Sequence, residues 1–145
     1  MTALKDKVAI VTGASSGIGR AAAKLFAAEG ARLVVTARRQ AELDALVGEI
    51  KADGGEAIAV AGDIREEALA QLLVETATRR FGGLDIGFNN AGIIGELGPI
   101  GQMASENWHE VIAINLTSAF LGAKHQVPAL EARGGGSLIF TSSFV

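Results

Sequence analysis

Small and polar residues gather where apolar runs end, and the first of these clusters has the composition of an anion-binding turn. The apolar run 8–11 leads into Thr12-Gly13-Ala14-Ser15-Ser16-Gly17-Ile18-Gly19, and an Ala-rich helical pattern follows. Glycines permit the backbone angles of a tight turn and carry no Cβ to hold a ligand away. The unpaired N–H groups and positive dipole end of the helix would face the same space. The turn predicts a nucleotide pyrophosphate site at Gly13, Ser15, Ser16, Gly17, Ile18 and Gly19. The alternative is an ordinary strand-to-helix turn.

The residues after the second apolar run bear on which dinucleotide would fit such a site. Thr36-Ala37-Arg38-Arg39 ends the run 32–36 and contains no acid. An NAD site usually places an acid here for the adenosine ribose hydroxyls. An arginine instead suits the 2′-phosphate of NADP, because its guanidinium is permanently charged and donates a fork of hydrogen bonds. Arg38, and secondarily Arg39, therefore favour NADP over NAD; the alternative is that both are solvated charges opening the next helix.

Polar residues also follow the third and fourth apolar runs. Asp63 comes after the run 56–61, where it is either the N-cap or turn residue of the next helix or a contact to an adenine ring. Asn89-Asn90-Ala91-Gly92 follows the run 83–88. Its amides can satisfy neighbouring backbone groups or ribose hydroxyls, and its small residues allow close approach. The expected cofactor contacts from these two segments are Asp63, Ile64, Asn89, Ala91 and Gly92.

The elements that must position these residues alternate along the chain. The patterns predict strands at 7–11, 32–36, 56–61, 83–88 and 137–141, and helices at 18–29, 40–51, 66–81 and 106–130. Strands alternating with longer helices are typical of a single α/β unit. Asn115 lies inside the last helix among apolar residues. Because a buried amide is costly without a partner, we expect Asn115 to have a specific one.

In type, order and spacing these motifs resemble the short-chain dehydrogenase/reductase family over nearly the whole chain. The resemblance rests on Thr12-Gly13-x-x-x-Gly17-x-Gly19, Asp63, Asn89-Asn90-Ala91-Gly92, Asn115 and a serine after the fifth strand. It implies a Rossmann-type doubly wound parallel sheet in the order 3-2-1-4-5, with the cofactor crevice between strands one and four. Residues 1–145 would then form an NAD(P)-binding domain in which the glycine loop binds pyrophosphate, Asp63 binds adenine, and residues 89–92 contact the riboses and the sheet.

The same resemblance implies catalytic roles for Asn115 and for a serine, which by its spacing matches Ser143, with Ser142 as the alternative. The family's tyrosine and lysine would follow Ser143 outside this chain, which contains no tyrosine. Lys124 and His125 are not expected to replace them. We therefore expect a domain truncated after strand five, without its C-terminal catalytic and substrate-binding part. Two functions follow: an NADP-dependent oxidoreductase acting on a carbonyl/alcohol pair, or a dinucleotide-binding module without turnover.

Composition excludes several other classes of protein. The chain has 145 residues, 49% of them hydrophobic, with a net charge of −3, no cysteine and two histidines. This is a globular composition that predicts neither a metal site nor a nucleic-acid partner. The absence of a long apolar stretch and of a signal-peptide pattern predicts a cytoplasmic protein without membrane contact. The apolar strand 137–141 would lie at a sheet edge, so a homo-oligomer is expected.

Overall fold

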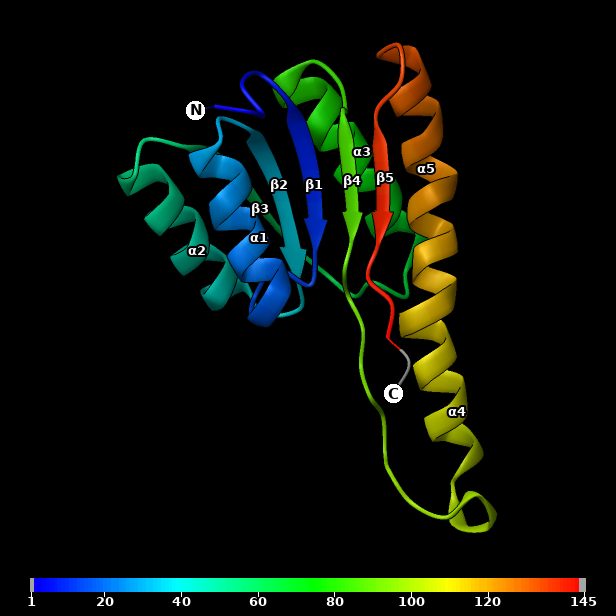
Figure 1. Ribbon diagram of the computed structural model, residues 1–145. Coiled ribbons are helices and arrows are strands. Elements are labelled where there is room, and N and C mark those ends of the chain that lie inside the picture. Colours follow the sequence, from blue (N-terminus) through cyan, green and yellow to red (C-terminus); the bar gives the residue numbers. More distant parts are fainter. Residues whose placement is uncertain (1, 144–145) are drawn as a thin grey trace.

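A five-stranded parallel sheet forms the middle layer of the computed structural model, which describes residues 2–143 (Figure 1). The strands lie in the order β3-β2-β1-β4-β5, which confirms the predicted doubly wound topology. Their bounds are β1 Val8–Thr12, β2 Arg32–Ala37, β3 Glu56–Ala61, β4 Ile86–Asn89 and β5 Ser137–Phe140. Because the order reverses between β1 and β4, the loops that leave these two strands diverge to opposite faces of the sheet.

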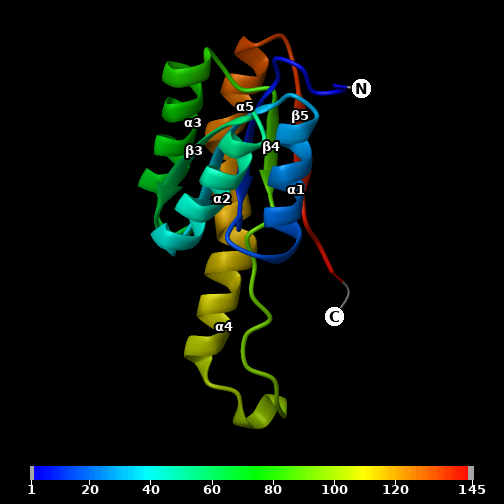
Figure 2. The same cartoon turned by 90° about the vertical axis from the view of Figure 1, so that its left-hand side faces the viewer.

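Helices cover both faces of the sheet. One layer holds α1 (Gly17–Ala28) and α2 (Gln40–Ala52), and the other holds α3 (Glu67–Phe81) and α5 (Ser118–Ala132). The helix α4 (Ser105–Ile112) and the short 3₁₀ turn η1 (Ile100–Gln102) precede α5, and they extend past the carboxyl edge of the sheet (Figures 1 and 2). Among residues 2–143 no helix is both long enough and apolar enough to cross a bilayer.

The central strand β1 is apolar from Val8 to Val11 because both of its faces are covered. Ala9 and Val11 pack with residues of α2 such as Leu43 and Leu46, whereas Val8 and Ile10 pack on the opposite face with residues of α3 and α5. Successive side chains of a strand point to opposite faces. A strand covered on both faces therefore has a nearly continuous apolar sequence. Because β1 is buried, its position in the sheet is fixed, and so is the position of the glycine turn that follows its carboxyl end.

Two predicted elements differ from the structure. The fourth strand was expected at 83–88 but begins at Ile86, since Gly82, with φ +87°, still belongs to the turn that ends α3. The predicted continuous helix 106–130 is divided by a π-helical segment, η2, at Ala113–Thr117. A π-helical turn inserts an extra residue and releases part of the helical hydrogen-bond ladder. Asn115 lies within this segment, where its side chain leaves the helix to bind a neighbouring loop.

A buried carboxylate closes the amino edge of the sheet. Asp85 is 7% exposed, and its Oδ2 accepts a hydrogen bond of 2.9 Å from the Val8 backbone N–H. Lys7 Nζ lies 3.7 Å and Arg133 Nε 3.3 Å from Asp85 Oδ1. One side chain thus joins the start of β1, the start of β4 and the end of α5, far from the edge where the candidate site lies.

Candidate functional site

The glycine turn lies at the carboxyl end of β1, where it passes directly into α1. Gly13 and Gly17 have positive φ values of +65° and +53°, which favour glycine. A Cβ at Gly17 would have no neighbour within 4 Å, so the space beside this backbone is open. Ser16 makes no capping hydrogen bond with any residue in 2–143, and the first turn of α1 contains no acid. The positive end of α1 therefore faces open space, as an anion site requires.

Gly13 and Gly19 permit close packing of the backbone, unlike Gly17, which has open space around it. A Cβ on Gly19 would collide with the Gly13 carbonyl oxygen, and one on Gly13 would come within 3.0 Å of the Ala91 Cα. The turn thus lies directly against the segment that follows β4. These contacts explain two of the three glycines by the fold itself. Packing does not explain Gly17, so this glycine is explained either by a ligand that approaches its backbone or by its positive φ alone.

The two arginines after β2 lie in different surroundings. Arg39 Nε forms an ion pair of 2.7 Å with Glu42 Oε2, and Arg39 Nη2 lies 3.5 Å from Ser15 Oγ. Arg38 is exposed and makes no hydrogen bond or ion pair within residues 2–143. The Arg38 guanidinium is thus available to an anion, whereas that of Arg39 is engaged by a neighbouring carboxylate. Both stay predicted cofactor contacts.

Asp63 lies one strand further along the same edge. Of the two structural roles predicted for Asp63, N-cap or turn residue, the structure shows the turn: Glu66 is the N-cap of α3, the Glu66 N–H donates to the Asp63 carbonyl at 3.0 Å, and the Arg65 N–H donates to Asp63 Oδ1 at 2.9 Å. The carboxylate pairs with Arg65, whose Nη2 lies 2.5 Å from Asp63 Oδ2. The hydrogen bonds from the Arg65 side chain and backbone lower the pKa of Asp63 from 3.8 to about 2. Asp63 is therefore an ionised acceptor throughout the physiological range.

The amides after β4 are held by protein partners. Asn89 Nδ2 donates to Gln126 Oε1 at 2.8 Å, and Gln126 Nε2 donates back to Asn89 Oδ1 at 2.9 Å. Gln126 is 2% exposed and lies on α5. The glycines Gly87 and Gly122 make room for the pair, since a Cβ on either would meet one of the two amides. The side chain of Asn89 thus pairs with the buried amide of Gln126. The predicted contact of Asn89 to a ribose would therefore use the second lone pair of its Oδ1 or its backbone groups.

Asn90 and Thr12 tie the end of β4 to the end of β1. The Thr12 hydroxyl oxygen accepts hydrogen bonds from the backbone N–H groups of Asn90 and Ala91, at 2.9 and 3.0 Å. Thr141 Oγ1 donates to Asn90 Oδ1 at 2.8 Å. Sequence reasoning had not assigned a role to Thr12 or Gln126. For Thr12 a signal existed, because it is the one polar residue in an otherwise apolar strand.

Asn115 has a specific partner, as predicted, but it is exposed, so the burial from which the partner was inferred is not found. Its Oδ1 accepts a hydrogen bond from the Ile93 N–H, and its Nδ2 donates to the Ile93 carbonyl, each at 2.8 Å. This is a reciprocal clamp between the π-helical segment and the loop after Gly92. A Cβ on Gly92 would lie 3.4 Å from Asn115 Oδ1, so the small residue permits the approach. Within this structure Asn115 fixes the course of the loop.

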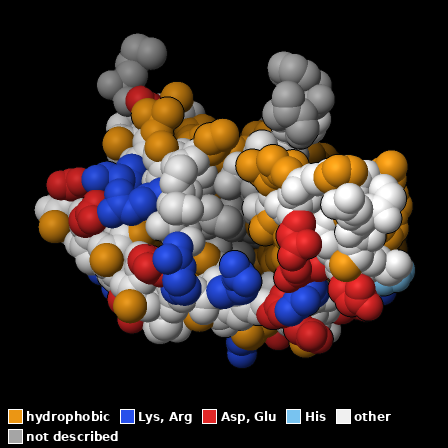
Figure 3. All heavy atoms as spheres, turned by 90° about the horizontal axis from the view of Figure 1, so that it is seen from below, with side chains coloured by type: hydrophobic (Ala, Val, Ile, Leu, Met, Phe, Trp, Pro, Cys, Tyr) orange, Lys and Arg blue, Asp and Glu red, His pale blue; other side chains and the backbone are white. Residues whose placement is uncertain are grey.

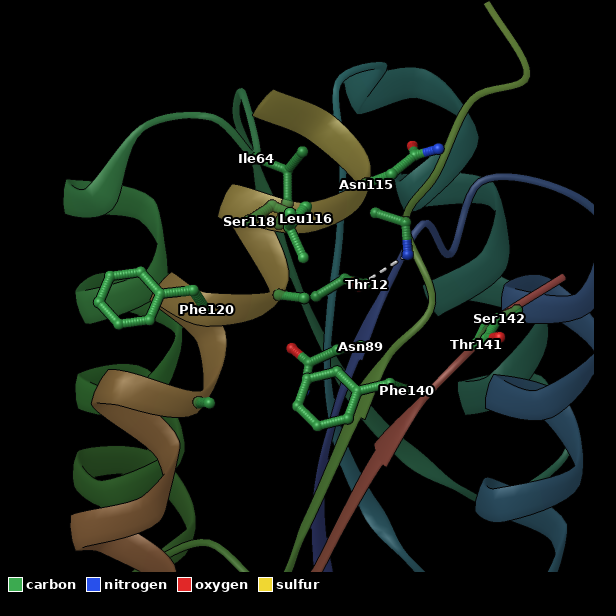
Figure 4. Close-up of a pocket in the computed structure, with 13 residues that line it drawn as sticks. Thr12, Ile64, Asn89, Asn115, Leu116, Ser118, Phe120, Phe140, Thr141 and Ser142 are labelled. Atoms are coloured by element: carbon green, nitrogen blue, oxygen red, sulfur yellow. Dashed lines mark hydrogen bonds between the residues drawn. The ribbon is translucent and has the colours of Figure 1, made fainter. Parts of the chain in front are cut away.

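A cavity of about 420 Å³ brings several of these residues together (Figure 4). The polar residues along its wall are Thr12, Asn89, Asn115, Ser118, Thr141 and Ser142; its apolar wall includes Phe120 of α5 and Phe140 of β5. Ile64 also lines it. Of the two candidate serines, Ser142 lines the cavity, whereas Ser143, the preferred candidate, lies outside its described lining. Lys124 and His125 contact Glu67 of α3 instead.

The surface is hollowed at this edge of the sheet (Figure 3). Figure 3 looks onto the edge and shows the recess between the half of the molecule with α1 and α2 and the half with α4. Lys and Arg side chains lie along one side of it. Among the described residues no cluster of possible metal ligands is found. An open glycine turn, an arginine without an ion pair among the described residues and an ionised carboxylate lie at one edge and suit a dinucleotide with its phosphates. Together with the sheet order they define a protein of the Rossmann type.

Comparison with known proteins shows to which family of Rossmann-type proteins the chain belongs. The sequence description of the short chain dehydrogenase family matches residues 7–145. The chain belongs to this family. It is 40% identical over 138 residues to a cyclohexanol dehydrogenase of Acinetobacter sp. (strain SE19), covering 95% of this chain and 55% of the relative. It is 39% identical over 142 residues to the 2,5-dichloro-2,5-cyclohexadiene-1,4-diol dehydrogenase LinX of Sphingobium indicum, covering 98% of this chain and 56% of the relative.

The fold is matched equally well by a solved structure. The crystal structure of a 3-ketoacyl-ACP reductase from Sinorhizobium meliloti 1021 superimposes with a TM-score of 0.90 at 41% identity, and the match covers 94% of this chain and 53% of that chain. The chain thus spans about half the length of the relatives it matches.

Proposed function

We propose that this chain binds NADP at the carboxyl edge of its sheet, as the cofactor-binding part of an oxidoreductase that acts on a small carbonyl or alcohol substrate. The observation that carries the proposal is the open backbone at Gly17, placed where the strand order reverses between β1 and β4. Phosphate oxygens can approach the first N–H groups of α1 there. The names of the relatives, which include a cyclohexanol dehydrogenase and a 3-ketoacyl-ACP reductase, support the carbonyl/alcohol pair.

The preference for NADP rests on Arg38. Its guanidinium is exposed, and within residues 2–143 no carboxylate forms an ion pair with it. A guanidinium can donate two hydrogen bonds to a phosphate, whereas a ribose 2′-hydroxyl offers it no charge. The segment 36–39 also contains no acid that would repel the 2′-phosphate. Arg39 and Ser15, which contact each other, complete the polar side of the phosphate site.

Each remaining residue has a defined task in the proposed reaction. NADP, when bound, supplies hydride exchange at its nicotinamide ring. Residues 89–92 line the ribose side through backbone groups and small side chains, and Asp63 with Ile64 meets the adenine. The hydroxyl of Ser143, or of Ser142 on the cavity wall, donates a hydrogen bond to the substrate oxygen and orients it. Asn115 holds the loop after Gly92 through Ile93.

A second candidate function is a dinucleotide-binding module without turnover. It is favoured by one observation, that these 145 residues contain no tyrosine. The family resemblance assigns the proton transfer to the substrate oxygen to a tyrosine assisted by a lysine. A serine hydroxyl alone can orient a carbonyl but is a poor proton donor at neutral pH. Residues 1–145 by themselves are therefore proposed to bind NADP and to leave substrate unchanged.

Titration of the full-length protein with NADPH and NADH by calorimetry tests the proposal. We expect NADPH to bind more tightly by about 1 to 3 kcal/mol, and Arg38→Ala to remove the difference. Arg79→Ala is the matched control, because Arg79 is an exposed arginine in the last turn of α3. Equal affinity for the two cofactors, or an unchanged preference in Arg38→Ala, would contradict the assignment of Arg38. Binding of neither cofactor would contradict the proposed function as a whole.

A further inference from the structure

Arg65 and Asp63 form a closed local pair at the end of β3. Asp63 Oδ1 accepts hydrogen bonds from both the Arg65 backbone N–H, at 2.9 Å, and Arg65 Nε, at 3.0 Å. Asp63 Oδ2 accepts from Arg65 Nε at 3.0 Å and from Nη2 at 2.5 Å. Both carboxylate oxygens are thus engaged by one residue two positions along the chain. Backbone and guanidinium together hold the carboxylate in a single orientation.

The pair still leaves the carboxylate accessible. The Asp63 side chain is 31% exposed and the Arg65 side chain 46% exposed. A carboxylate oxygen has more than one acceptor direction, so an oxygen that already binds Arg65 can accept another hydrogen bond. Asp63 is followed by Ile64, which lines the cavity at the carboxyl edge of the sheet. A ligand that contacts Ile64 is therefore near Asp63, the residue that directly precedes it in the chain.

Other charged side chains act on both members of the pair. Besides Arg65, the positive charge that acts on Asp63 is that of Arg38. Arg65 in turn is affected by the acidic side chains of Glu110 and Glu66. The hydrogen bonds from Arg65 act on Asp63 more strongly than the charge of Arg38 does, so Arg65 is the principal partner of the carboxylate.

We propose that Arg65 is a positioning residue that holds the Asp63 carboxylate as a fixed acceptor for the exocyclic amino group of an adenine base. This proposal rests on the proposed function, since it needs an adenine dinucleotide at this edge. A fixed, ionised carboxylate accepts hydrogen bonds and donates none. It therefore favours a base with an amino group over one with a carbonyl oxygen at the same position. Orientation matters because hydrogen bonds weaken steeply when they are misaligned.

The experiment compares NADPH with its hypoxanthine analogue, in which a carbonyl oxygen replaces the amino group of the base. Calorimetric titration of the full-length protein measures both affinities in the wild type and in Arg65→Gln. The wild type is expected to prefer NADPH by about tenfold or more. Arg65→Gln is expected to lose most of this preference, chiefly by weaker binding of NADPH. Arg79→Gln, which removes an exposed arginine at the other end of α3, should keep the full ratio.

The ratio separates positioning from general damage to the fold. A variant that is merely destabilised would bind both dinucleotides more weakly by the same factor, and this result would overturn the proposal. An unchanged ratio in Arg65→Gln would also overturn it, as would equal affinity of the wild type for the two dinucleotides. Arg65→Lys keeps the charge but lacks the fork and should lose the preference too; a wild-type ratio there would exclude the fork as the cause. Failure of the wild type to bind either dinucleotide would instead contradict the proposed function.

Discussion

Replacing Gly17 with valine tests whether the open backbone of the glycine turn is a phosphate site. Gly17 has φ +53°, and a Cβ there would meet no atom within 4 Å. The substitution therefore causes no collision inside the protein. Its conformational cost is that of a left-handed backbone in an ordinary residue, roughly 1–2 kcal/mol, with a β-branched residue at the upper end. The branched side chain would occupy the space in front of the first N–H groups of α1.

The effect on binding should exceed the effect on stability. Each lost hydrogen bond from an N–H group to a charged phosphate is worth about 1.5–3 kcal/mol, so loss of one weakens NADPH binding by roughly tenfold to 150-fold. Urea unfolding measures the stability of the variant, and calorimetric titration measures its affinity for NADPH. We expect a folded protein that has lost most of its cofactor binding.

Gly54→Val is the matched control, because Gly54 also has a positive φ, +86°, and open space around its Cβ position. It lies just after α2 and before β3, at the opposite edge of the sheet from the glycine turn. Gly54→Val should lose a similar amount of stability and keep its affinity for NADPH. Normal binding in a folded Gly17→Val protein would refute the assignment of the pyrophosphate site. Equal loss of binding in both variants would show that strain alone is responsible.

Three further predictions concern other parts of the molecule. Asp85→Ala should lower the free energy of unfolding in urea by about 1–3 kcal/mol, because the buried Val8 N–H loses its acceptor; an unchanged midpoint would contradict this. The folded-state pKa of Asp63 lies near 2, below its ordinary 3.8, so the Asp63–Arg65 pair stabilises the protein above pH 4 and this contribution is lost as the pH falls toward 2. The stability difference between wild type and Asp63→Asn should therefore shrink over that interval in urea unfolding, and a constant difference would be inconsistent with the ion pair. Residues 1–145 alone should associate, because the edge strand β5 exposes apolar side chains; light scattering that shows a stable monomer would disprove this.

Much of the fold was predictable because its determinants are local. Strand β1 is apolar from Val8 to Val11, which is typical of a strand covered on both faces, and the structure places α2 on one face and α3 on the other. The glycine turn, Asp63 and residues 89–92 each follow a strand, and the carboxyl ends of parallel strands meet at one edge. Their gathering at that edge therefore follows from the order of the elements. The sheet order itself came from the family resemblance, and the structure confirms it.

The partners of the polar side chains were decided by the tertiary structure. Asn89 pairs with Gln126, 37 positions along the chain, and Asn115 pairs with Ile93, 22 positions away. No periodicity in the sequence reports such pairs, because each depends on how a helix packs against the sheet. The π-helical segment around Asn115 was also absent from the sequence-based prediction, which gave one continuous helix over 106–130.

The sequence by itself determined which residue types stand at the ends of the strands, and hence the kind of ligand that this edge can hold. The structure decided which of those residues are already engaged: Arg39 with Glu42 and Asp63 with Arg65, close in the chain, and Asn89 with Gln126, which only the tertiary fold brings together. It also left Arg38 unpaired within residues 2–143 and the backbone at Gly17 open. The physical reason is that strand, turn and helix patterns arise from neighbouring residues, whereas the availability of a charge or a donor depends on every group packed around it.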